Sequence, residues 1–202
     1  MTNRRTKRAL QLAQRRLEGF YQLEAAPDVT GFIRRQAGGL REALLVEQRQ
    51  EQLEIALLLP AETEYLVEGT WSDLWVQALE GVSHFVYLAE RARTELPLTQ
   101  LELELQAEVD KYLLLALETE GDLATLARLH QTLFERIRFL DPEGTQTGDR
   151  YRLANSLASR FIARLLGTGT PRHWQRNLRR FYRAGQTEKI HLAHVSPRDL
   201  AA

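Results

Sequence analysis

From Trp71 to Gly185 the sequence is a succession of segments with helical periodicity, separated by residues that begin or end helices. The clearest start follows Pro97, where Thr99 and Glu102 have the spacing of a capping box. The predicted helices cover residues 72–91, 100–119, 122–140, 149–166 and 171–184. A tight turn at Gly121 would set two of these helices antiparallel, so the sequence predicts an antiparallel helical bundle.

The first 60 residues have a different pattern. Helical periodicity runs from Arg4 to about Leu23, and residues 42–59 read as two apolar strands around a polar turn, although a helix is the alternative there. We therefore predict an α+β fold, mostly α, with a small N-terminal β-hairpin. A single domain would span residues 1–202: residues 1–60 hold the helix and hairpin, residues 61–186 the bundle, and residues 187–202 a tail with a half-buried turn or strand.

Composition excludes several classes of protein. The 202 residues are 44% hydrophobic, which is enough for a core and too much for a disordered chain. Cysteine is absent, so disulfide frameworks, cysteine zinc sites and thiol nucleophiles are excluded. There is neither a secretory signal nor an apolar run of about 18 residues, so we expect a soluble, cytoplasmic protein without a transmembrane segment.

The net charge of zero hides a segregation of charge along the chain. Residues 1–40 carry eight basic and three acidic side chains, residues 41–120 carry five and seventeen, and residues 121–202 carry fourteen and seven. This basic–acidic–basic order either pairs internally or displays separate charged faces to partners.

Arginines gather on one side of the predicted helix after Pro171. An arc of about 100° holds five of them, opposite an aromatic-rich packing side; they are Arg172, Arg176, Arg179, Arg180 and Arg183. Like charges on one stripe repel, so an anionic surface is expected against them. Candidates are an acidic protein, nucleic-acid phosphates, anionic lipid, or the acidic middle of this chain.

Two polar residues interrupt apolar helix faces. Glu108 falls within the apolar side of helix 100–119, and His130 falls near the centre of that of helix 122–140. In a helical hairpin closed at Gly121 the two lie within roughly 3 Å of the same level, given about 1.5 Å of rise per residue. We predict that Glu108 and His130 face each other or share a buried polar network, either as a structural pair or as an acid/base or metal-binding pair.

Glu80 and His84 form a second candidate pair, four residues apart on helix 72–91. The pattern places them with Tyr87 and Arg91 on the side opposite the apolar face, which predicts a hydrated surface. Their spacing differs from that of di-iron bundles and of two-histidine zinc helices.

Three runs of the sequence resemble a conserved-hypothetical family of bacterial proteins with no assigned function. They lie at residues 79–87, 100–112 and 179–186, and the resemblance covers most of the chain from about Leu40. It implies a bacterial cytoplasmic protein and transfers no site residue.

The predicted function is that of a non-enzymatic adaptor or regulatory protein that binds a protein partner, or a second copy of itself, through the arginine stripe. The alternative is a nucleic-acid-binding protein that uses the same stripe, with the basic residues near Arg4, on phosphates. A third possibility is a metal-dependent or acid/base enzyme around Glu108 and His130. The sequence assigns no catalytic residue, metal ligand or cofactor.

Overall fold

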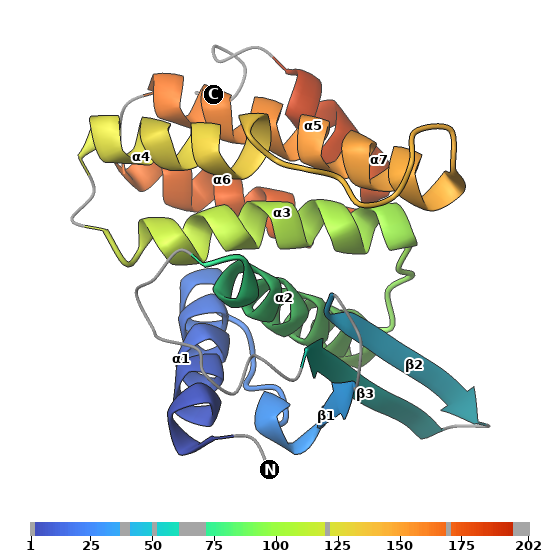
Figure 1. Ribbon diagram of the computed structural model, residues 1–202. Coiled ribbons are helices and arrows are strands. Elements are labelled where there is room, and N and C mark those ends of the chain that lie inside the picture. The colour runs from blue at the N-terminus through green and yellow to red at the C-terminus, as the bar shows by residue number, and fades with distance from the viewer. Residues whose placement is uncertain are drawn as a thin grey trace. The chain divides into compact units, whose positions relative to one another are not determined.

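The computed structural model describes residues 3–36, 41–49, 52–60, 72–119, 122–168 and 171–195. The protein is α+β and mostly helical, as predicted, with one small sheet among the described residues (Figure 1). The chain divides into two compact units, Met1–Leu96 and Pro97–Ala202. No helix in the described part of the chain is both long and apolar enough to cross a membrane.

The first unit combines two helices with the sheet. Its elements in chain order are α1 (Arg4–Tyr21), η1 (Val29–Gly31), β1 (Ile33–Gln36), β2 (Ala43–Arg49), β3 (Gln52–Pro60) and α2 (Asp73–Arg93). Helix α2 packs against α1 and against strands β2 and β3. Helix α2 therefore lies with the N-terminal elements, whereas the sequence analysis grouped it with the helices that follow.

Helix α1 forms where the periodicity predicted it. The Asn3 side chain accepts a hydrogen bond from the Arg5 amide at 3.1 Å and caps the first turn. The apolar stripe that includes Leu10 and Leu17 is buried, and the helix ends at Gln22 in the left-handed conformation (φ 56°).

The two strands predicted within residues 42–59 are present as β2 and β3. The strands pair antiparallel from Arg49 opposite Gln52 to Ala43 opposite Leu58. Strand β1, which the sequence did not predict, pairs parallel with the other edge of β3, giving the order β1-β3-β2. Four residues with two central arginines show no alternation, so β1 depends on its tertiary pairing with β3.

Helix α2 begins as predicted, with the Ser72 hydroxyl accepting a hydrogen bond from the Trp75 amide. The expected hydrated side is wrong, because every residue from Ala78 to Tyr87 is buried. Arg91 is buried as well and donates two hydrogen bonds to the Tyr87 hydroxyl, at 2.6 and 3.0 Å. An amphipathic pattern separates polar from apolar sides but cannot distinguish a hydrated polar side from a buried one.

The second unit is entirely helical among its described residues. Its elements are α3 (Gln100–Ala116), α4 (Leu123–His130), the π-helical turn η3 (Gln131–Glu135), α5 (Gln146–Thr168), α6 (Pro171–Arg183) and α7 (Gln186–His194). Helix α3 packs against α4, α5 and α7, and α5 also contacts α6. The Thr99 hydroxyl accepts a hydrogen bond from the Glu102 amide at 3.1 Å, which confirms the predicted start of α3.

Two predicted boundaries in this unit are wrong. The helix expected over residues 122–140 ends with the turn η3. Leu140, beyond that turn, is exposed and does not join the core. The tail expected to hold a turn or strand instead forms α7, which packs on α5. A buried lysine in α7, Lys189, donates to the Phe181 carbonyl at 2.6 Å and so ties α7 to α6.

Candidate functional site

Helix α6 carries the predicted arginine stripe and is held in place by its opposite side. Leu178, Phe181 and Tyr182 are buried, and the Phe161 and Phe181 rings stack with centroids 4.2 Å apart. This aromatic side provides the apolar packing that holds α6 in the second unit.

The structure exposes most of that stripe. Arg176, Arg180 and Arg183, at positions i, i+4 and i+7, are exposed, and Arg179 is half-buried. Arg172 lies in α6, but its side chain is outside the described residues. We call these five residues the arginine face. Arg180 Nε lies 3.3 Å from Glu188 Oε1, and both side chains are about half exposed, at 54% and 49%.

Glu108 and His130 are both buried but have different partners. Lys111 Nζ donates to Glu108 Oε1 at 2.9 Å, one turn along α3. His130 Nε2 lies 3.0 Å from the Ser159 carbonyl oxygen of α5, and its Nδ1 lies 3.6 Å from Glu135 Oε1. Glu108 is neutralised by a lysine of the same helix, and His130 contacts a backbone carbonyl of α5. These contacts do not support a direct acid/base pair between Glu108 and His130.

A buried network elsewhere in the second unit links three charged or polar side chains. Lys189 donates to Gln106 Oε1, and Gln106 Nε2 donates to Asp110 Oδ1 at 2.8 Å. All three side chains are buried, and the network joins α7 to α3. Burial also raises the pKa of Tyr112, whose hydroxyl donates to the Leu126 carbonyl. These contacts join α3 to α7 and to α4.

A hollow of about 120 Å³ lies in the first unit between the α1–η1 connection and α2. Its charged lining residues form ion pairs: Arg93 lies 3.3 Å from Glu24 and 2.9 Å from Glu90. Hydrogen bonding to Glu90 raises the pKa of Arg93. The lining holds two carboxylates against one guanidinium, so one negative charge remains in excess there.

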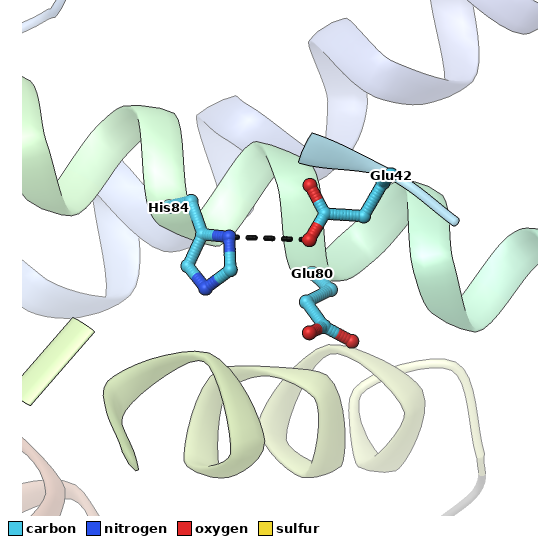
Figure 2. Close-up of side chains that lie close together, drawn as sticks. All are labelled: Glu42, Glu80 and His84. Atoms are coloured by element: carbon cyan, nitrogen blue, oxygen red, sulfur yellow. Dashed lines mark ion pairs between the residues drawn. The ribbon is translucent and has the colours of Figure 1, made fainter. Parts of the chain in front are cut away.

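Three side chains that can bind a metal ion converge in the first unit. Glu80 and His84 lie on α2, and Glu42 immediately precedes the first residue of β2. One ligand atom from each lies within 4.8 Å of the other two, and His84 Nδ1 is 3.3 Å from Glu42 Oε1. Figure 2 shows Glu42 facing His84, with Glu80 beside them. We call these residues the Glu–His cluster.

A glycine lets the β2 end approach α2 at this point. A Cβ atom added to Gly81 would lie 2.7 Å from a methyl carbon of Leu57 and 3.2 Å from Glu42 Oε2. The absence of a side chain at residue 81 therefore makes room for the Glu42 carboxylate next to the helix.

Sequence reasoning found Glu80 and His84 but missed Glu42. The two α2 residues share a side because they are four positions apart, a spacing visible in any sequence. Glu42 is almost 40 residues earlier, and only the packing of β2 on α2 brings it near. The apolar segment that follows Glu42 in the sequence predicts a strand, but it does not indicate that Glu42 belongs to a site.

Comparison with models of protein families, with curated proteins and with solved structures finds no match for this chain. The functional argument therefore depends on the residues and contacts described above.

Proposed function

We propose that this protein is a non-enzymatic adaptor that binds an acidic protein surface through the arginine face of α6. The observation that carries the proposal is the exposure of Arg176, Arg180 and Arg183 on one side of a helix whose other side is buried. Guanidinium groups bind carboxylates through two parallel hydrogen bonds, so such a row suits a partner rich in Asp and Glu.

One internal partner of the arginine face, Glu188, is weakly held. The Arg180–Glu188 pair is about half exposed on both sides, and exposed pairs contribute only about 0–1 kcal/mol. A partner carboxylate can replace Glu188 at little cost. Arg183 at the C-terminal end of α6 also interacts favourably with the negative end of the helix dipole, which keeps a cation in place there.

The chemistry of α6 favours a protein over a nucleic acid. Single-stranded nucleic acids stack their bases on exposed aromatic rings, but Phe181 and Tyr182 are buried and Trp174 is half-buried. Phosphate contacts alone remain open to the arginine face, and they constitute the alternative function, together with basic residues at the start of α1.

A comparison of two anionic ligands, each titrated with the protein, tests the proposal. A fluorescent glutamate-rich peptide and a fluorescent 20-base-pair DNA would be titrated with the full chain at several salt concentrations, with anisotropy as the readout. We expect peptide binding to weaken at least about tenfold in Arg176→Ala/Arg180→Ala/Arg183→Ala, which corresponds to about 1.4 kcal/mol. The matched control, Arg4→Ala/Arg5→Ala/Arg8→Ala, changes three exposed arginines of α1 and should leave peptide binding intact.

Two results would reject this function. Tighter binding of DNA than of peptide, with a salt slope that falls by about two to three in the α6 triple variant, would establish the nucleic-acid function instead. Binding of neither anion at low salt would show that the arginine face is not an anion-binding surface.

A further inference from the structure

We propose that Glu42, Glu80 and His84 form a binding site for one divalent transition-metal ion, with Zn²⁺ as the reference ion. The inference is independent of the arginine face, because it concerns side chains of the first unit only.

The distances within the Glu–His cluster are those of ligands around one ion. Zinc binds imidazole nitrogen and carboxylate oxygen at about 2.0–2.2 Å, which places two ligand atoms of one ion about 3.0–3.4 Å apart. The 3.3 Å between His84 Nδ1 and Glu42 Oε1 falls within that interval. The Glu80 oxygen is within 4.8 Å of both atoms, so a small change of its side-chain torsions completes a three-ligand set.

The backbone prepares this arrangement. Glu80 and His84 lie one turn apart on α2, in a stretch that is buried all round, so their positions are set by a packed helix. Glu42 is held by the antiparallel pairing that begins at Ala43 and by the close approach that Gly81 allows. A site supported by a helix and a strand places its ligands more precisely than one built on loops.

The charges of the Glu–His cluster also favour the binding of a cation. The side chains of Glu42 and His84 are 6% and 5% exposed, and Glu80 is 4% exposed. Two carboxylates close to one another repel, and a cation bound between them relieves that repulsion. One divalent ion bound by two carboxylates and a neutral imidazole gives a net charge of zero.

The ligand types select the kind of ion. Mg²⁺ and Ca²⁺ prefer sites made wholly of oxygen, whereas imidazole suits Zn²⁺, Cu²⁺, Fe²⁺ and Ni²⁺. Affinity across such a site should follow Mn²⁺ < Co²⁺, with Mg²⁺ far weaker. Three protein ligands are one fewer than a closed tetrahedral zinc site has, so a water molecule would complete the coordination.

Calorimetry on the metal-free full chain tests the site. We expect one equivalent of Zn²⁺ or Co²⁺ to bind and Mg²⁺ not to compete at tenfold excess. Glu80→Gln and His84→Gln should each weaken Zn²⁺ binding more than about 100-fold, since even indirect partners of metal ligands are worth about 10–100-fold. The matched controls are Glu90→Gln, on the same helix, and His130→Gln, a buried histidine of the second unit; neither should change the affinity.

The wild type alone can also decide the question, if a ligand variant fails to fold. Bound Co²⁺ should give visible d–d absorption, and Zn²⁺ should shift the ring ¹⁵N resonances of a single histidine. Absence of both signals, or Zn²⁺ affinity that is the same in Glu80→Gln and His84→Gln as in the wild type, would overturn the proposal. The Glu–His cluster would then be a hydrogen-bonded network that holds β2 on α2.

Discussion

Replacing Lys189 by methionine should strongly destabilise the second unit. Lys189 is fully buried and donates hydrogen bonds to Gln106 Oε1 and to the Phe181 carbonyl oxygen. Its ammonium group also lies 4.5 Å from the centre of the Phe181 ring. Methionine retains the length of the side chain, so the substitution removes the charge and the donors while leaving most of the packing.

The size of the effect follows from these contacts. Hydrogen bonds to a charged group contribute about 1.5–3 kcal/mol each, and removal of one partner from a buried charged network costs about 3–5 kcal/mol. We expect Lys189→Met to lower the free energy of unfolding by about 3–5 kcal/mol. A domain of ordinary stability has only about 5–15 kcal/mol in total, so the loss should be large in any assay.

Urea denaturation followed by circular dichroism measures this loss. The half-exposed Lys7 of α1 provides the control, since Lys7→Met should change stability by less than about 0.5 kcal/mol. A double-mutant cycle with Asp110→Asn adds a second readout, because Gln106 connects Asp110 to Lys189. We expect a coupling energy of at least about 1 kcal/mol between these two positions. A loss below about 1 kcal/mol in Lys189→Met, or additive effects in the cycle, would refute the reasoning.

Two further predictions concern local structure. Gly81→Ala should destabilise the first unit by about 1 kcal/mol, because the new methyl group would lie 2.7 Å from a methyl carbon of Leu57. Gly19→Ala, with nothing within 4 Å of the new methyl group, should stabilise α1 by about 0.5–1 kcal/mol. Changes of the same sign in the free energy of unfolding of the two variants, measured by urea denaturation, would contradict this. Hydrogen bonds from Thr125 lower the pKa of Asp122, the N-cap of α4, so its stabilising effect is present above the unfolded-state pKa and is lost as pH falls through the folded-state pKa. Asp122→Ala should therefore reduce the urea midpoint at pH 6 and have a smaller effect near pH 2, and an equally large difference at both pH values would exclude the charge of the carboxylate as its cause.

The predictions that depend on neighbouring residues are the ones the structure confirms. The caps at Ser72 and Thr99 are visible because a capping side chain bonds a backbone amide two or three residues away. The antiparallel pairing of β2 and β3 is likewise local, since only two residues separate the strands along the chain. The separation of α6 into an aromatic side and an arginine side follows from helical periodicity alone, whereas the exposure of the arginine side depends on tertiary packing.

The amino-acid sequence by itself determined most of the helices, the strands β2 and β3 and the candidate arginine face, because each depends on contacts within a few residues or on one periodic pattern. Tertiary structure decided the pairing of β1 with β3, the burial of Glu80 and His84, and the approach of Glu42 to both. Those features depend on residues far apart in the chain, and whether a polar side faces water or the interior is set by what packs against it.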